Sequence, residues 1–439
     1  MAARSTAVSH GMRVVFDVSR GRECTAARLY LANAASRQGA SLRDFRQVSG
    51  RHFAPKRNCA RIVGMPIATD RKTDRPRTSS LYSSRQKQSL RRRLLSWYRT
   101  NARDLPWRRS RDPYRVWISE IMLQQTQIAT VRDYFARFIE ALPNVHRLAA
   151  ADEVEVLRLW EGLGYYRRAR QLRAAAAQIV AQHGGKFPDD PRVLQELPGI
   201  GRYTAGAIAS IAFGRRAAIL EANTIRLLSR LIGYRHDPLR AAGQRTLWKV
   251  AEDILPQQKI AEFNQALMEL GSLVCTPTEP KCHACPLSSL CAAQAAGLQV
   301  EIPPAKPRTV YTCVREAAVI VRKNERVLLR QCAVNERWAG LWDFPRFELT
   351  AKDPLFAGHE IVQKVRLQTG VECTPGALLK TLKHGVTRYR ITLDCYEAAF
   401  AGGRPRSADH SPVCWTPLVK LPDLPLSTTG RKIAELARQ

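Results

Sequence analysis

The sequence predicts two folded domains, an all-α domain followed by an α+β domain, behind a basic extension with too few apolar residues for a core. Helical apolar periodicity begins near Ser89 and continues without a convincing strand to about residue 310. The Pro-rich stretch 303–307 then reads as a linker, and the residues after it alternate apolar and polar side chains as half-buried strands do. A chain of 439 residues is long enough for two or three separate cores.

The extension over residues 1–84 is rich in Arg, Ser and Ala and poor in acids, so we expect it to be disordered and to have no catalytic role. Three interpretations stay open: an organelle transit peptide, a start codon assigned too early with Met65 as the true initiator, or a basic arm that tethers DNA.

The all-α domain is assigned to residues 85–302, the linker to 303–309 and the α+β domain to 310–439. The expected elements are helices around 90–98, 116–138, 151–160, 164–183 and from 204 onward, strands over 314–322, 326–330 and 387–396, and a helix over 359–367.

Charge and cysteine usage restrict the partners. The chain carries 70 Lys and Arg against 38 Asp and Glu, which favours a polyanion, either nucleic acid or an anionic membrane surface. No apolar run approaches the roughly 18–20 residues of a membrane span, so we expect no membrane partner. Eleven cysteines, four of them crowded between Cys275 and Cys291, indicate a metal site in a reducing compartment, such as the cytoplasm and nucleoid of a bacterium.

A glycine-rich turn lies between two helical patterns in Leu197-Pro-Gly-Ile-Gly-Arg-Tyr-Thr-Ala-Gly206. Pro198 fixes its own φ, while Gly199 and Gly201 can adopt conformations that are closed to other residues. The free backbone N–H groups of such a hairpin bind an anion without any side-chain charge. In so basic a chain the expected anion is a nucleic-acid phosphate.

The cysteine loop has a distinctive spacing, because six, two and five residues separate Cys275, Cys282, Cys285 and Cys291. Four thiolates on one loop can enclose a single metal centre. Structural zinc sites usually bring two Cys-x-x-Cys pairs, and only one is present, so the spacing favours iron–sulfur. The alternative, cysteines buried in a core, fits this Pro-rich loop poorly.

The glycine hairpin and the cysteine loop together resemble the helix-hairpin-helix DNA glycosylases that carry one 4Fe-4S cluster, over roughly residues 88–292. Endonuclease III-like members use a lysine after the Gly-Arg of the hairpin to cut the strand, and Tyr203 stands there instead. The stretch 117–127, Trp-Ile-Ser-Glu-Ile-Met-Leu-Gln-Gln-Thr-Gln, is similar to the adenine DNA glycosylase branch. So are Leu-Pro-Trp-Arg at 105–108, Gly-Leu-Gly-Tyr-Tyr at 162–166 and Asn-Gln-Ala-Leu-Met-Glu-Leu-Gly at 264–271.

The resemblance implies that Glu120 is the general acid. Its apolar neighbours should desolvate it and raise its pKa, which keeps a proton available for a ring nitrogen of the departing adenine. A solvent-facing helix glutamate is the alternative. Glu221 occupies the position of the family aspartate that stabilises the sugar cation; it is one methylene longer, and Ala222 replaces a glycine. Asn223 would orient this carboxylate, and Tyr203 would hydrogen-bond to it or to the sugar, unless these two residues serve only as turn and core residues.

The same resemblance implies the DNA and base contacts. Arg108 and Gln265 match positions that line the adenine pocket, and the hairpin glycines Gly199 and Gly201 would contact a phosphate. The positions expected to enter or flank the duplex opposite the extruded base are Gln125, Thr126 and either Tyr165 or Tyr166.

The second domain resembles a Nudix-like domain from Trp338-Ala-Gly-Leu-Trp-Asp-Phe-Pro345 onward. Residues 359–365 lack the Arg-Glu-x-x-Glu-Glu core that binds magnesium in hydrolytic Nudix enzymes, so we expect a reader of 8-oxoguanine rather than a pyrophosphatase. The family Phe-Ser-His falls on Leu382-Lys383-His384, which makes Lys383 and His384 the candidate contacts. A basic strand that faces DNA over 383–390 is the alternative.

These observations predict a monomeric, monofunctional adenine DNA glycosylase that acts on double-stranded DNA with adenine opposite 8-oxoguanine or guanine. An endonuclease III-like lyase is one alternative. A DNA-binding homologue that lost catalysis through the change at Glu221 is the other.

Overall fold

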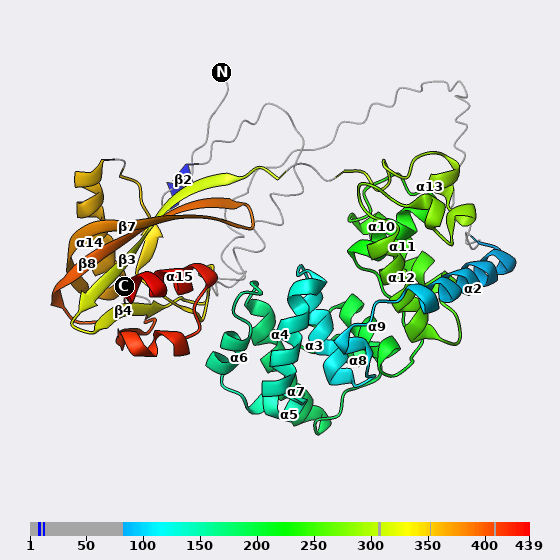
Figure 1. Cartoon of the computed structure of the whole chain (residues 1–439), viewed down its shortest axis with the longest axis horizontal. Coiled ribbons are helices and arrows are strands. Elements are labelled where there is room, and N and C mark those ends of the chain that lie inside the picture. The colour runs from blue at the N-terminus through cyan, green and yellow to red at the C-terminus, as the bar shows by residue number, and fades with distance from the viewer. Residues whose placement is uncertain (1–7, 10–11, 14–81, 306–308, 352, 408–409) are drawn as a thin grey trace, which may run out of the picture. The chain divides into compact units, whose positions relative to one another are not determined.

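The computed structural model describes residues 8–9, 12–13, 82–305, 309–351, 353–407 and 410–439. The predicted disordered extension therefore lies almost wholly outside the described residues. Within it, the structure describes β1 (Val8–Ser9) and β2 (Met12–Arg13), as an antiparallel pair, and residues 82–84. The expectation of disorder is wrong at residues 82–84, because Tyr82 is buried and Ser84 begins a helix. Beyond the extension, the predicted order of an all-α domain and an α+β domain is confirmed (Figure 1).

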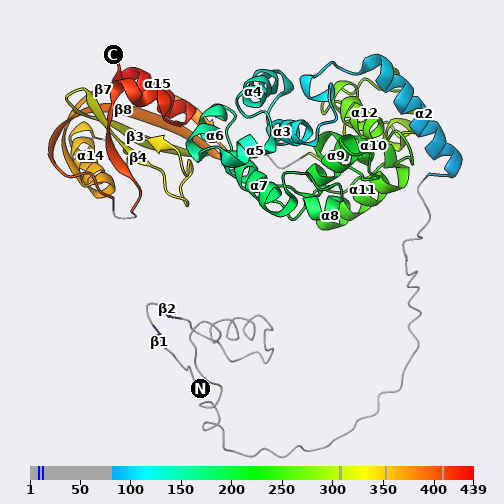
Figure 2. The same ribbon diagram turned by 90° about the horizontal axis from the view of Figure 1, so that it is seen from below.

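The all-α domain packs its helices around two apolar cores. Figure 2 shows these helices from below. Its helices are α2 (Ser84–Asn101), α3 (Pro113–Leu123), α4 (Ile128–Ala141), α5 (Val145–Ala150), α6 (Glu153–Leu159), α7 (Arg167–His183), α8 (Pro191–Leu194), α9 (Arg202–Ile211), α10 (Ala222–Ile232), α11 (Ala241–Ile254), α12 (Ile260–Leu273) and α13 (Ala292–Ala295). The first core gathers side chains of α3, α4, α7 and α9, and the second gathers side chains of α2, α10, α11 and α12.

Helices α3 and α9 carry residues of the candidate active site, and both helices are almost entirely buried. Helix α9 consists largely of Ala, Gly and Ile, so neighbouring backbone can approach it closely. A Cβ at Gly206 would lie 2.3 Å from the carbonyl oxygen of Ala218, so this position accepts no side chain without movement of the backbone.

The predicted hairpin joins α8 to α9, and its two glycines differ. Gly199 has φ 77°, a left-handed conformation that glycine adopts without strain. Gly201 has φ −88° and is the N-cap of α9, a conformation open to any residue, so the expectation of unusual backbone at Gly201 is wrong. Its lack of a side chain instead leaves the start of α9 uncovered, since nothing lies within 4 Å of a Cβ built there.

The α+β domain is built on a sheet of order β5-β4-β3-β8-β7, with β6 beside β3 and β9 beside β4. Its elements are β3 (Thr312–Lys323), β4 (Arg326–Gln331), β5 (Trp342–Asp343), β6 (Arg346–Glu348), α14 (Pro354–Thr369), β7 (Val371–Val386), β8 (Tyr389–Gly403), β9 (Val413–Pro417) and α15 (Thr428–Ala437). The expected strands 314–322 and 326–330 and the expected helix 359–367 fall within these elements. The expected strand 387–396 starts two residues too early, because residues 387–388 form the turn before β8.

The central strand β3 is buried on both faces, which explains its nearly continuous apolar run. Ala318 and Ile320 pack in one core with Ile433 of α15, whereas Val319 and Val321 pack in the other with Ile361 of α14. Strands β3 and β8 run parallel, with Glu316 opposite Leu393. No helix within the described ranges is long and apolar enough to cross a membrane.

Candidate active site

An open cavity of about 780 Å³ lies between α3, the start of α9, the start of α10 and α12. That volume is in the range of pockets for small ligands and would hold a base with its sugar. The cavity brings together most of the predicted site residues from distant parts of the sequence. Those that line it are Arg108, Glu120, Gln125, Thr126, Tyr203, Glu221, Asn223 and Gln265.

Glu120 lies on the cavity wall with only 5% of its surface exposed. Burial raises the pKa of its carboxyl from 4.5 to about 7; the hydrogen bond that Tyr203 donates to Oε2 opposes this shift, and the nearby Glu221 adds to it. The expected hydrogen bond from Tyr203 to Glu221 is wrong, because the Tyr203 hydroxyl donates to Glu120. The pKa of that hydroxyl is itself raised well above 10, chiefly by burial, so Tyr203 stays a donor. The site therefore holds a carboxyl that carries a proton near neutral pH.

Glu221 is the N-cap of α10, and its carboxylate turns toward the start of its own helix. Oε1 accepts from the Thr224 N–H at 2.9 Å, and Oε2 accepts from the Asn223 N–H at 2.8 Å and from Asn223 Nδ2 at 3.2 Å. Burial raises its pKa, while these hydrogen bonds and Arg226 oppose that shift. Ala222 is the first residue of the helix, where alanine is favourable, so its replacement of glycine adds no backbone strain.

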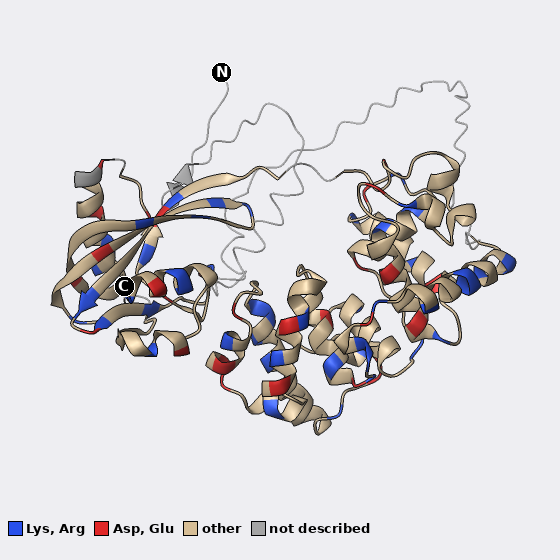
Figure 3. Ribbon diagram, viewed as in Figure 1, with Lys and Arg blue, Asp and Glu red and all other residues tan. Residues whose placement is uncertain are grey.

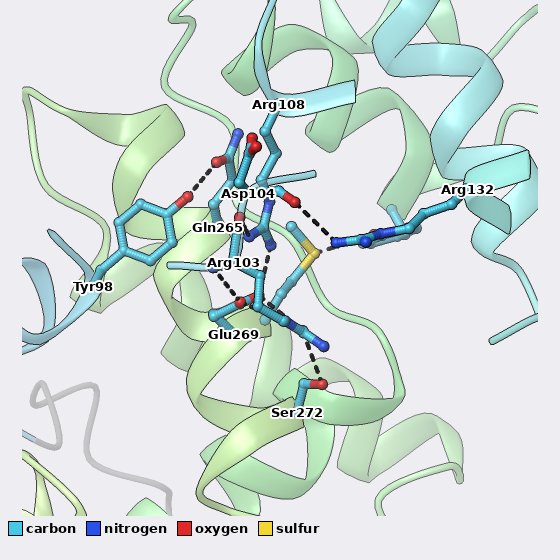
Figure 4. A network of polar contacts seen from close by, with 10 residues as sticks. Tyr98, Arg103, Asp104, Arg108, Arg132, Gln265, Glu269 and Ser272 are labelled. Carbon is cyan, nitrogen blue, oxygen red and sulfur yellow. Dashed lines mark hydrogen bonds and ion pairs between the residues drawn. The ribbon is translucent and has the colours of Figure 1, made fainter. Parts of the chain in front are cut away.

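A network on the other wall holds Arg108 (Figure 4). Arg108 Nη2 donates to Glu269 Oε2 at 2.7 Å, and Arg103 donates to both oxygens of the same carboxylate. Burial alone would raise the pKa of Glu269, but the hydrogen bonds from Arg103 and Arg108 lower it to about 2. Two guanidinium groups thus share one buried carboxylate, which leaves this wall positively charged.

Gln265 is fixed on the same wall by Tyr98, whose hydroxyl donates to Gln265 Oε1 (Figure 4). Since its carbonyl oxygen is thus engaged, Gln265 offers its Nε2 amino group as a donor. Glu269, Arg103 and Tyr98 are site residues that the sequence analysis missed. The spacing of four between Gln265 and Glu269, within one helical stretch, would have indicated that Glu269 faces the same cavity.

The predicted duplex-contacting residues lie on two loops. Gln125 is exposed on the loop after α3 at φ 62°, and Thr126 follows it on the cavity rim. On the second loop Tyr165 has φ 47° and is 52% exposed, whereas Tyr166 is 9% exposed. Of the two neighbouring tyrosines, Tyr165 is therefore the one whose ring is accessible to a partner.

The four cysteines of the 275–291 loop line one small cavity, together with Arg230 of α10. Arg230 Nη1 lies 3.3 Å from Cys275 Sγ and also donates to the Thr276 carbonyl, while Nη2 donates to the Pro277 carbonyl. Within the described residues, no group of three or more His, Cys, Asp or Glu is gathered tightly enough for a single metal ion. Four thiols around a shared space suit the larger cage of an iron–sulfur cluster better, because its cysteines bind separate irons.

In the α+β domain, Lys383 and His384 lie on β7, opposite Thr392 and Ile391 of β8. Lys383 is exposed, whereas His384 Nε2 lies 3.2 Å from Arg346 Nη2. Burial, together with Arg346, lowers the pKa of His384 to about 4, so its imidazole is neutral at pH 7. On α14, Glu360 is occupied by the Thr350 and Ala351 N–H groups and by Lys364, so it serves the structure of the preceding loop.

Lys and Arg residues occur along many helices of the all-α domain (Figure 3). Helix α2 carries six Arg and Lys residues and no acid. Lys87 and Arg91 bind groups of the 253–255 segment, while Arg85, Arg92 and Arg99 are exposed at intervals of seven along one face. This distribution suits contact with a polyanion.

Comparisons with known proteins agree with this geometry. The family model described as HhH-GPD superfamily base excision DNA repair protein matches residues 118–253, and a NUDIX domain model matches residues 316–436. Among solved structures, a thermostable thymine-DNA glycosylase is similar at a TM-score of 0.45 and 29% identity, covering 48% of this chain and 98% of the other.

The chain is 34% identical over 398 residues to the adenine DNA glycosylase of Rattus norvegicus, which covers 79% of this chain and 77% of the rat protein. It is 32% identical over 396 residues to that of Homo sapiens, covering 77% and 72%. With this cavity, this helical domain and relatives matched over most of their length, the chain belongs to the adenine DNA glycosylase family and is a DNA glycosylase.

Proposed function

We propose that the protein hydrolyses the N-glycosidic bond of adenine that is paired with 8-oxoguanine or guanine in double-stranded DNA, without cutting the strand. The observation that carries this proposal is the hydrogen bond between the buried Glu120 and the partly buried Tyr203 in a cavity of base size. Glu120 supplies a protonated carboxyl. Tyr203 supplies a phenol at the position where a lyase has an amine.

The residues divide the work as follows. Arg108 and Gln265 present N–H donors that suit the ring nitrogens of a purine extruded into the cavity. Glu120 gives its proton to the leaving base, and the carboxylate of Glu221 stabilises the positive charge that develops on the sugar. Asn223 keeps that carboxylate in place, because it donates to Glu221 Oε2 from both its backbone and its side chain.

Strand cutting by a Schiff base needs an amine beside C1′ of the sugar. Tyr203 occupies the hairpin position from which such an amine would act, and its hydroxyl is engaged with Glu120. This arrangement supports hydrolysis by a monofunctional enzyme.

The rate of base release should decrease above neutral pH. The acid acts only when protonated, and at pH 7 about half of a carboxyl with a pKa near 7 carries its proton, against roughly 0.3% for one at 4.5. Glu221 must be ionised, so the profile gains an acidic limb and becomes bell-shaped. Single-turnover rates measured across pH should show a basic limb centred near 7. A rate that stays constant up to pH 9, about two units higher, would contradict the role of Glu120.

Cys275, Cys282, Cys285 and Cys291 would hold the 4Fe-4S cluster. Such a cluster, when bound, would shape the loop 275–291, whose exposed Lys281 would suit a phosphate contact. Purified protein should contain about four iron and four sulfide per chain, and Cys282→Ser should lower both. Stoichiometric zinc instead would overturn this assignment.

In the α+β domain we propose a reader of 8-oxoguanine without pyrophosphatase activity. The structural use of Glu360 supports this, because no other acid lies in the stretch 359–365. Lys383 is exposed and His384 beside it is half-buried, so Lys383 is the more accessible contact. We also propose that the protein is a monomer. A reducing compartment is in keeping with the cysteine usage.

A single-turnover assay with two duplexes tests the proposal. Adenine release from a duplex with adenine opposite 8-oxoguanine, with strand breaks only after alkali, is the expected result. Cleavage of a thymine-glycol duplex without alkali would instead favour an endonuclease III-like lyase. Binding of both duplexes without any release would favour a homologue that has lost catalysis.

A further inference from the structure

One buried arginine, Arg168 of α7, joins the two loops that carry Gln125 and Tyr165. Its Nη1 donates to the carbonyl oxygens of Ile121 at 2.7 Å, Met122 at 3.2 Å and Gln124 at 2.5 Å. Its Nη2 donates to the carbonyl oxygens of Leu163 and Gly164, both at 3.2 Å. Arg168 is 8% exposed, and although burial lowers its pKa to about 10, it remains a cation at pH 7.

The first loop needs this arginine because α3 ends there. The last carbonyl groups of a helix have no partner within the helix and lie at the negative end of its dipole. Gln124, the C-cap of α3, has an extended backbone at ψ 110°, so the chain leaves the helix without a left-handed glycine cap. The guanidinium of Arg168 takes the place of that cap at the end of the helix that carries Glu120.

The second observation concerns the backbone that follows each bound carbonyl. Gln125 has φ 62° and Tyr165 has φ 47°, conformations that cost a non-glycine residue on the order of 1 kcal/mol each. Arg168 binds the Gln124 carbonyl directly before the first and the Gly164 carbonyl directly before the second. Each hydrogen bond fixes the peptide plane about which the unusual φ is set.

We propose that Arg168 is a positioning residue that holds Gln125 and Tyr165 as one preformed wedge for the gap left by the extruded base. The ring of Tyr165 lies 5.7 Å from the guanidinium, so it is supported by the same group. The inference deepens the proposed function and rests on it for the step that the wedge serves. It assigns Arg168 to base extrusion and not to bond cleavage.

The first test concerns the free protein and needs no activity. In Arg168→Met, amide hydrogen exchange should increase in residues 124–127 and 161–165 together, because both loops lose the same partner. Arg173→Met is the matched control, since Arg173 also lies on α7 and also binds a carbonyl oxygen, that of Ala151. It should leave both loops unchanged. Faster exchange in one loop only, or in neither, would overturn the proposal. Arg168→Lys gives a milder variant if the Met variant does not fold.

The second test measures how far the target base is extruded from the duplex. The duplex carries 2-aminopurine in place of adenine, and the fluorescence of 2-aminopurine increases when it leaves the base stack. Arg168→Lys should lower the extruded fraction by about 10- to 100-fold, the scale of a 1 Å misplacement. In a Gln125→Ala/Tyr165→Ala background the same change should have no further effect. The pH midpoint of base release, set by Glu120, should not move. The positioning role would be refuted if Arg168→Lys extruded the base as fully as the wild type. It would also be refuted if Arg168→Lys lowered the extruded fraction as much in the Gln125→Ala/Tyr165→Ala background as it does alone. If the wild-type chain extrudes the base but releases no adenine, the proposed function fails while the wedge stands.

Discussion

Glu120→Gln is expected to lower the rate constant of adenine release by about 10³-fold or more, because general acid catalysis contributes on the order of 10² to 10⁴. The amide has almost the same shape and still accepts the hydrogen bond of Tyr203, but it has no proton to give. Single-turnover kinetics on the adenine:8-oxoguanine duplex measure the loss.

Two controls separate chemistry from folding and binding in this variant. The affinity for the same duplex should stay within about threefold, because Glu120 is buried and pairs within the protein. Glu140→Gln changes an exposed glutamate on α4 and should leave the rate as it is. An unchanged rate in Glu120→Gln would rule out this residue as the acid.

Glu221→Gln is expected to reduce the rate by about 10²- to 10³-fold, since it removes a fixed negative charge aimed at a developing cation. The structure gives Glu221 a second role as the N-cap of α10, so some stability is lost as well, about 0.5–2 kcal/mol. Thermal unfolding of the same preparation measures that part separately. A rate equal to the wild type with a lowered melting temperature would mean that Glu221 only caps the helix.

Glu221→Asp is the matched comparison, because aspartate keeps the charge and is itself a favoured N-cap. We expect it to retain the wild-type rate within about tenfold, since the carboxylate withdraws by roughly one carbon–carbon bond. A loss as large as that of Glu221→Gln would show that reach, and not charge, limits this position.

The sequence alone led to much of the site because motif residues are local. Glu120, Tyr203 and Asn223 lie in short stretches that resemble the motifs of the family, and the resemblance identified them. Hydrogen bonds between distant segments follow no such pattern. Arg103 and Glu269 are 166 residues apart, and only the folded structure brings the guanidinium of the first against the carboxylate of the second. This is why the wall that holds Arg108 was missed.

The exposed fractions of the side chains show which candidate residues are accessible to a partner, and the sequence motifs do not. Tyr165 and Tyr166 are chemically identical neighbours, and only their exposed fractions distinguish the accessible ring. His384 looked like a surface contact until Arg346 appeared beside its ring, far away in sequence. Gly201 was expected to adopt a conformation closed to other residues, but its φ is ordinary and it matters through its missing side chain.

The contact between α3 and α9 determines how substitutions near Glu120 would alter the pH dependence of the enzyme. Glu120 comes from α3 and Tyr203 from α9, and the burial of Glu120 where these helices meet raises the pKa of its carboxyl to about 7. The working pH is therefore a property of helix spacing. A substitution that lets one water molecule reach Glu120 would move the pH midpoint toward 4.5 while the fold persists. The pH profile of a variant thus reports the hydration of its core.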